Sequence, residues 1–338
     1  MERKGRIETM FRLAIDAMGG DGGAPVVIEG VLKAVQQMEN VSFVLFGHQD
    51  QVDVSLLQHS RIEFIHTEEI ITGEDEPAKV IRKKKNSSMM QMAQYVKEGK
   101  AHAGISAGNT GALMAAGIFI VGRIQGIERP ALAPTLPTID GNGFLLLDVG
   151  ANIEAKTEHL VQYAQMGAIY CEKVRGIQNP RIGLVNIGTE AHKGTSLYQE
   201  TYQKLSESNL NFVGNIEARE LLFGVADVCV TDGFSGNQIL KATEGTALAL
   251  FQVIKEELMS STFSKMGALL LKSKFRAIKN KMDYTEYGGA ALFGLNAPMI
   301  KAHGSSDKNA FFHAIRQGVF MLENEMVEQI RQSYTKNK

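Results

Sequence analysis

The sequence predicts an α/β protein, a three-layer, doubly wound and mostly parallel sheet with helices on both faces. Short apolar runs alternate with helix-length amphipathic stretches, which is the pattern of a parallel sheet covered by helices. Glycine-rich turns follow several of these runs, as they do where a strand leads into a helix. The 338 residues are 44% hydrophobic and 22% charged, a globular composition that excludes global disorder.

The elements follow in order from this alternation. Strands are expected at Phe11–Asp16, Val41–Phe46, Ile62–Ile65, Ala101–Ile105, Gly143–Val149, Ile182–Ile187 and Val225–Thr231. Helices are expected at Val26–Met38, Ser88–Lys97, Thr110–Val121, Glu158–Val174, Ser196–Ser206, Asn237–Leu258 and Asp307–Gln332.

The domain organisation is expected to be simple. No repeat or low-complexity linker divides the chain, so residues 11–332 are expected to form a single bilobed catalytic domain with its cleft at the carboxyl ends of the strands. Residues 1–10 are charged and lack the apolar centre of a signal peptide, which indicates an N-terminal arm or tag. The uncharged span Ala103–Gly122 is long enough to cross a bilayer, but its glycines and polar residues favour a strand, a loop and a buried helix.

Several function classes are disfavoured. The net charge of -1, from 36 Lys and Arg against 37 Asp and Glu, argues against general nucleic-acid binding. Cys171 and Cys229 form no CxxC pair, which is typical of a reduced, cytosolic protein. The chain has no dinucleotide fingerprint, no P-loop and no histidine pair at metal-ligand spacing, so we expect no cofactor and no resident metal.

Five glycine-rich turns, each between an expected strand and the chain that leads into the next helix, are the strongest functional signal, and we call them corners. They are Asp16–Asp21, Ser106–Gly111, Asp148–Asn152, Asn186–Glu190 with Lys193–Thr195, and Asp232–Asn237. Glycine lets the backbone approach a ligand closely, and the free N–H groups of a following helix attract anions. In a doubly wound sheet these corners gather along one edge, which predicts a site for phosphate or another oxyanion. The candidate ligand-binding residues are Ser106, Gly108, Asn109, Thr110 and Gly111, then Asn152, Gly188 and Thr189, and then Gly233, Ser235 and Gly236. The carboxylates of Asp16, Asp21, Asp148 and Asp232 lie at the same corners and are expected to orient donors or hold loops.

Two side chains at these corners have two interpretations each. Lys193 lies in a glycine-rich turn region, where its charge would neutralise a phosphate or a developing oxyanion, or where it is simply a solvated lysine at a helix start. Asn237 either points its amide into the cleft or caps the helix that follows.

Serine hydrolase chemistry is the alternative enzyme class. Gly104–Gly108 fits the G-x-S-x-G nucleophile elbow with Ser106 as nucleophile, and Asp232 and His303 follow in the order that an α/β-hydrolase requires. The donor-rich run directly after Ser106 is better suited to holding an oxyanion, which favours the anion site. Outside enzymes, the alternative is a module that binds lipid surfaces or a carrier protein.

Residues 259–285 form a basic, apolar-rich segment. Between Ser264 and Met282 it carries six basic residues and no acidic one, interspersed with large apolar side chains. Such helices lie in a membrane interface or pack on the protein body or a second subunit. The apolar positions do not fall on one clean face, so both interpretations stay open.

At its corners the chain closely resembles the PlsX-type phosphate acyltransferases of bacterial phospholipid synthesis. The matching stretches occur in the family's order and span about residues 11–332. They are Ile15–Asp21, Gly104–Ala112, Leu147–Asn152, Asn186–Glu190 with Lys193-Gly194, and Asp232–Asn237.

The resemblance implies transfer of a fatty acyl group from acyl carrier protein to inorganic phosphate, which forms an acyl phosphate. It implies a fold like phosphate acetyltransferase and the isocitrate/isopropylmalate dehydrogenases. It also implies a cytoplasmic homodimer associated peripherally with the inner face of the plasma membrane, where an integral-membrane glycerol-3-phosphate acyltransferase uses the product. The basic segment then becomes the expected membrane contact, through Phe263, Met266, Leu269, Leu270 and Leu271. On this mechanism Lys193 offsets the charge of phosphate or of the tetrahedral intermediate, and Asn237 donates a hydrogen bond to one of them.

Overall fold

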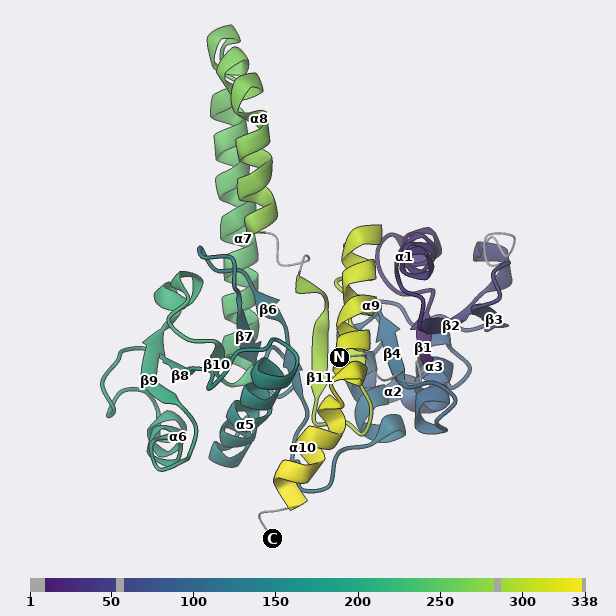
Figure 1. Cartoon of the computed structure of the whole chain (residues 1–338), viewed down its shortest axis with the longest axis horizontal. Coiled ribbons are helices and arrows are strands. Elements are labelled where there is room, and N and C mark those ends of the chain that lie inside the picture. Colours follow the sequence, from purple (N-terminus) through teal and green to yellow (C-terminus); the bar gives the residue numbers. More distant parts are fainter. Residues whose placement is uncertain (1–9, 53–57, 283–286, 336–338) are drawn as a thin grey trace, which may run out of the picture. The chain divides into compact units, whose positions relative to one another are not determined.

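The computed structural model describes residues 10–52, 58–282 and 287–335 (Figure 1). The chain divides into two compact units. The first comprises the described parts of residues 1–132, 173–176 and 287–338, and the second comprises 133–172 and 177–286. Each unit has its own sheet, of seven strands in the first and five in the second, and most of the strand pairs are parallel. The predicted α/β class is therefore confirmed. The five corners, however, do not lie along a single sheet edge as expected, because they are divided between two sheets.

The sheet of the first unit has the order β3-β2-β1-β4-β12-β11-β5. Its strands are β1 (Phe11–Asp16), β2 (Val41–Gly47), β3 (Ile62–His66), β4 (Ala103–Ser106), β5 (Ala131–Ala133), β11 (Ala290–Phe293) and β12 (Met299–Lys301). From β1 the chain moves outward through β2 to β3, and then crosses back past β1 to β4. The order of the strands reverses between β1 and β4, the place where open α/β sheets bind ligands.

Helices cover both faces of this sheet. The first unit contains α1 (Gly23–Gln37), α2 (Pro77–Lys83), α3 (Ser88–Lys97), α4 (Thr110–Ala116), α9 (Lys308–Glu323) and α10 (Met326–Thr335). The helix α1 packs against α9, whereas α3 contacts β1, β2 and β4. The connection through α1 runs from β1 outward to β2, whereas the connection through α3 runs back from β3 to β4. Because both crossovers are right-handed, α1 and α3 lie on opposite faces of the sheet, which gives the unit three layers.

The sheet of the second unit has the order β6-β7-β10-β8-β9. Its strands are β6 (Thr135–Leu136), β7 (Phe144–Leu147), β8 (Ile182–Asn186), β9 (Phe212–Glu217) and β10 (Val228–Val230). Because β7, β10, β8 and β9 run parallel, the residues that follow β7, β8 and β10 emerge at the same edge of the sheet.

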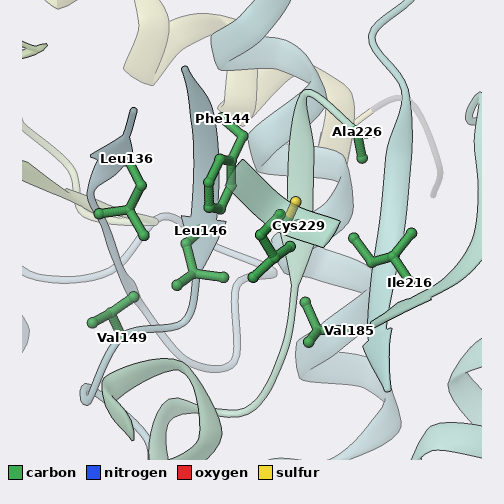
Figure 2. Close-up of a cluster of buried hydrophobic side chains, with 9 residues drawn as sticks. Leu136, Phe144, Leu146, Val149, Val185, Ile216, Ala226 and Cys229 are labelled. Atoms are coloured by element: carbon green, nitrogen blue, oxygen red, sulfur yellow. The ribbon is translucent and has the colours of Figure 1, made fainter. Parts of the chain in front are cut away.

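A buried cluster on one face of this sheet holds the second unit together (Figure 2). Leu146 of β7 and Cys229 of β10 belong to it, and the start of α7 (Gly233–Leu258) covers it with Ile239 and Leu240. The opposite face is covered by α5 (Thr157–Lys173), whose Gly167 lies close to Val228. The other members of the cluster are Leu136, Phe144, Val149, Val185, Ile216, Leu221 and Ala226.

The two longest helices of the described residues form a hairpin within the second unit. After α7, the helix α8 (Thr262–Lys281) runs back alongside it (Figure 1). An open groove of about 520 Å³ lies between them, lined by apolar side chains such as Phe251 and Phe275. The second unit also contains α6 (Ser196–Ser206), which packs against β8 and β9, and a short 3-10 helix, η4 (Ala218–Phe223), after β9.

Several predicted elements need correction. The predicted helix Asp307–Gln332 is two helices, because Glu325 between α9 and α10 adopts the left-handed backbone conformation (φ 49°). The predicted helix Thr110–Val121 continues from α4 as a short π-helical turn, η3 (Gly117–Val121). The predicted strand Gly143–Val149 pairs only over Phe144–Leu147, since Asp148 already belongs to the corner. Of the predicted terminal arm, residues 1–9 lie outside the described part of the chain, as do residues 283–285 of the basic segment.

One close approach in the second unit gives a stability test. A Cβ on Gly236, in the first turn of α7, would lie 1.9 Å from the Asp148 carbonyl oxygen, so this position requires glycine. Gly245 is exposed in the same helix and has nothing within 4 Å of a Cβ. We predict that Gly236→Ala lowers the free energy of unfolding by about 1–3 kcal/mol or more through overpacking. Gly245→Ala, the matched control, should raise it by about 0.5–1 kcal/mol, because alanine is the better helix former. Urea denaturation of both variants measures this, and equal effects would contradict the close approach.

Candidate functional site

The first unit brings two of the predicted corners together at the carboxyl ends of β1 and β4. Asp16 ends β1, and its Oδ2 accepts a hydrogen bond from Ser106 Oγ at 2.6 Å. Its Oδ1 accepts from Ser88 Oγ at 2.6 Å and from the Met18 N–H at 3.2 Å. Ser106 Oγ in turn accepts the Gly108 N–H at 2.9 Å. The Asp16 carboxylate therefore holds both corners from inside the unit.

A buried lysine lies behind these corners. Lys301, the last residue of β12, is paired in register with Ser106 of β4. Its ammonium donates to the Ala107 carbonyl at 3.1 Å and to the Ala302 carbonyl. Burial raises the pKa of Asp16, while the hydrogen bonds from Ser106 and Ser88 and the nearby Lys301 charge act in the opposite direction.

The residues after Ser106 mainly build the local structure. Asn109 caps α4 by accepting the Ala112 N–H at 3.0 Å, and its amide donates to carbonyls of the loop 72–75. Thr110 is exposed at the start of α4, and Gly111 lies against Pro77. Asp21 is exposed, and its N–H donates to the Gly304 carbonyl at 2.7 Å.

In the second unit the corners after β7 and β10 interlock. Asp148 is fully buried, and its carboxylate accepts the backbone N–H of Asn152 at 2.7 Å and the side-chain amide of Asn152 at 3.1 Å. The Asn152 amide also donates to the Tyr163 hydroxyl at 2.9 Å. The Asn152 carbonyl accepts the Gly233 N–H at 3.0 Å, which ties this corner to the start of α7. The Asn152 side chain is thus committed to the corner itself.

Asp232 is the N-cap of α7. Its carboxylate accepts the Ser235 N–H at 2.9 Å and the Ser235 hydroxyl at 2.8 Å. It also accepts a hydrogen bond from the hydroxyl of Tyr198 on α6, which lies 3.1 Å from Thr231 Oγ1. Burial, followed by the bond to Asp232, raises the pKa of Tyr198. This bond connects the corner after β10 to the chain that follows β8.

Lys193 lies in that chain, between β8 and α6. Its backbone is held by hydrogen bonds to Glu190 and Asn186, each at 3.1 Å. Its half-buried stem packs over Gly188, whose missing Cβ would lie 3.2 Å from Lys193 Cγ. Thr189 beside it is exposed. The Lys193 ammonium makes no ion pair or hydrogen bond with any side chain or carbonyl that the structure describes.

Asn237 lies one residue beyond Gly236 in the first turn of α7. Its side chain is beside Gly150 of the β7 corner, where a Cβ would be 3.7 Å from the amide carbon. It does not cap the helix, because Asp232 does so. Within the described ranges, its amide has no hydrogen-bond partner. Lys193 and Asn237 are thus the two predicted catalytic side chains whose polar groups remain available.

The serine hydrolase alternative is not supported. Ser106 is 0% exposed, and its hydroxyl donates to a carboxylate instead of facing a histidine base. His303 hydrogen-bonds Ser305 at 2.8 Å. The five corners also fall into two groups, Asp16 with Ser106 in the first unit and Asp148, Gly188 and Asp232 in the second.

Sequence reasoning missed the partners that hold the corners. Ser88 follows a basic run and carries no motif, and Tyr198 lies in an ordinary amphipathic helix. Lys301 had the one usable signal, a lysine directly after the apolar pair Met299-Ile300. No group of three or more His, Cys, Asp or Glu side chains in the described ranges is placed to hold a metal ion.

Comparisons with known proteins show the family to which the chain belongs. Residues 11–329 match the model of a family described as fatty acid synthesis protein. The phosphate acyltransferase of Geobacillus sp. (strain WCH70) is 58% identical over 327 residues, which cover 97% of this chain and 99% of that protein. The phosphate acyltransferase of Bacillus licheniformis is 59% identical over 319 residues, covering 94% of this chain and 95% of the relative.

Solved structures support the predicted fold. A branched-chain phosphotransacylase from Enterococcus faecalis V583 has a TM-score of 0.57 at 15% identity, with 93% of this chain and 100% of that chain covered. A phosphotransacetylase from Streptococcus pyogenes has a TM-score of 0.56 at 16% identity, with 94% of each chain covered. The expected likeness to phosphate acetyltransferase is confirmed for the fold, whereas the likeness to the two dehydrogenases stays a prediction. On the family match and the near-full-length identity to these relatives, the chain belongs to the fatty acid synthesis protein family of phosphate acyltransferases.

Proposed function

We propose that the protein transfers a fatty acyl group from the thioester of acyl carrier protein to inorganic phosphate. The proposal rests on which polar groups at the corners of the second unit have hydrogen-bond partners and which do not. The carboxylates of Asp148 and Asp232 are occupied by donors of their own corners. The Lys193 ammonium and the Asn237 amide have no such partner among the residues described. A cation and a neutral donor left available suit an anionic substrate.

The reaction needs no nucleophile from the protein. A phosphate oxygen attacks the thioester carbonyl carbon, the carbonyl π electrons move to oxygen, and a tetrahedral oxyanion forms. Its collapse re-forms the carbonyl and breaks the C–S bond, so that the thiolate of the carrier protein leaves and acyl phosphate is formed. The proton that hydrogen phosphate loses ends on the thiolate. Stabilising the oxyanion and orienting the two reactants are then the main tasks of the site.

The corners of the second unit are assigned to phosphate. Lys193 neutralises charge on phosphate or on the oxyanion, and Asn237 donates a hydrogen bond to one of them. Gly188, Thr189, Gly233, Ser235 and Gly236 form the surrounding backbone, and Asn152 holds the corner beside Asn237. In the first unit, the backbone of Ser106–Gly111 is assigned to substrate binding, because the Ser106 hydroxyl is committed to Asp16.

Removal of the Lys193 ammonium tests this assignment. We predict that Lys193→Ala lowers turnover by about 10²–10³, the usual effect of losing one preorganised stabilising group. The fold should persist, because the Lys193 backbone bonds do not depend on its side chain. The assay follows phosphate-dependent release of free carrier protein from the acylated form. Lys173→Ala removes an exposed lysine at the end of α5 and serves as the control. Wild-type turnover in Lys193→Ala would remove this residue from the mechanism.

We also assign the α7–α8 hairpin to peripheral contact with an anionic membrane surface. Phe263 and Leu270 are 88% and 84% exposed, and Met266, Leu269 and Leu271 are exposed as well. The lysines and arginine of α8 lie among them, as in helices that bind at the headgroup boundary. No described helix has the length and apolar character needed to span a bilayer. Pairing of the hairpin with a second copy in a homodimer is the competing occupant of this surface.

Liposome flotation distinguishes the two occupants. We predict that Leu270→Glu with Leu271→Glu abolishes flotation with vesicles containing anionic phospholipid, because the change removes apolar area and adds repulsion. Phe223→Glu, which changes an exposed apolar residue outside the hairpin, should float like the wild type. If the double variant floats normally but becomes monomeric by light scattering, the hairpin surface is a dimer contact instead.

A further inference from the structure

A cationic strip in the first unit has no role in the function so far. The segment 79–85 carries five basic residues and no acidic one. Lys79 pairs with Glu76 at 2.7 Å, and Lys84 pairs with Asp75 at 2.7 Å. The remaining three, Arg82, Lys83 and Lys85, have exposed side chains that make no ion pair or hydrogen bond with the described residues. We call these three residues the cationic strip.

The N-terminal side of the strip is joined to the corner after β4. The helix α2, which contains Arg82 and Lys83, packs on α4. Gly111 allows this contact, because a Cβ there would lie 2.5 Å from Pro77 Cγ at the start of α2. The Asn109 amide donates to the carbonyls of Thr72 and Asp75, at 3.2 and 3.3 Å, in the loop before α2.

The C-terminal side is joined to the same corner by another route. Ser88 follows Lys85 by three residues and donates to Asp16, which accepts from Ser106. The Asn86 N–H donates to the Glu69 carboxylate at 3.0 Å, so this carboxylate is held by the backbone beside the strip. The strip is therefore fixed at both ends to the Ser106–Gly111 corner.

We propose that the cationic strip docks the acidic surface of the acyl carrier protein. This inference rests on the proposed function, which supplies a protein-borne thioester as acyl donor. Three unpaired cations fixed beside a substrate-binding corner match a macromolecular partner that presents several carboxylates, because complementary charge speeds encounter and sets orientation.

The test separates docking from chemistry. Arg82→Glu, Lys83→Glu and Lys85→Glu are combined, and steady-state rates are measured against acyl carrier protein and against phosphate. We expect the KM for acyl carrier protein to rise at least about tenfold, with kcat and the KM for phosphate within about twofold of wild type. Added NaCl should raise this KM in the wild type and have little effect on the triple variant. A loss of kcat with an unchanged KM for the carrier protein would overturn the proposal.

The matched control is Lys97→Glu, compared with each single change of the strip. Lys97 is exposed at the far end of α3 from Ser88, about 14 Å along the helix. It should leave the KM for acyl carrier protein unchanged, whereas Lys83→Glu should raise it. If Lys97→Glu and Lys83→Glu raised the KM equally, the net charge of the protein, and not the cationic strip, would govern its encounter with the carrier protein.

A binding measurement distinguishes failure of this inference from failure of the proposed function. Fluorescence anisotropy of labelled carrier protein reports docking without turnover, and the wild type should bind at least about tenfold more tightly than the triple variant. If the wild type binds but transfers no acyl group to phosphate, the docking surface stands and the proposed function fails. If binding is equal, or if the triple variant loses binding to anionic vesicles instead, the docking proposal is wrong.

Discussion

The hydrogen bonding of carboxylates at the ends of buried strands is the constraint on which the candidate site depends. Asp16 ends a parallel strand, Asp148 and Asp232 come just after one, and all three are nearly inaccessible to solvent. An ionised carboxylate is costly to bury unless several donors satisfy it, and each of these accepts hydrogen bonds from its own or a neighbouring corner. The free-energy cost of burying the carboxylate therefore favours one conformation of the corner, because a displaced backbone would leave the carboxylate without hydrogen-bond donors.

This constraint also explains how acidic residues can coexist with an anionic substrate. Asp232 accepts from Ser235 and Tyr198, and Asp148 accepts from Asn152, so their negative charge is directed into hydrogen bonds within the second unit. Asn237 lies on the corner of Asp232, and Lys193 lies on the corner after β8. The side-chain polar groups of both have no described partner. The hydrogen bonds therefore distinguish the residues that hold the corners from the residues whose polar groups remain available to bind the substrate.

Much of this arrangement was predictable from the sequence, for physical reasons. Apolar runs such as Val41–Phe46 and glycine corners such as Asp232–Asn237 are local signals, and both appear where they were expected. The strand β12 was missed because three residues without alternation give no periodic signal, and its value as a strand depends on pairing with β4. Likewise, Asn109 looked like a ligand-binding residue, but a cap and a ligand-binding amide cannot be distinguished by spacing alone. The distribution of the corners over two sheets is a long-range property that no local pattern encodes.

A crystal structure of the wild-type protein at saturating inorganic phosphate tests the central claim most directly. We predict a phosphate ion within hydrogen-bond distance of Lys193 Nζ, of Asn237 Nδ2 or of both, with the carboxylates of Asp148 and Asp232 still bonded to their own corners. Phosphate bound to neither side chain, or either carboxylate released to face the ion, would contradict it.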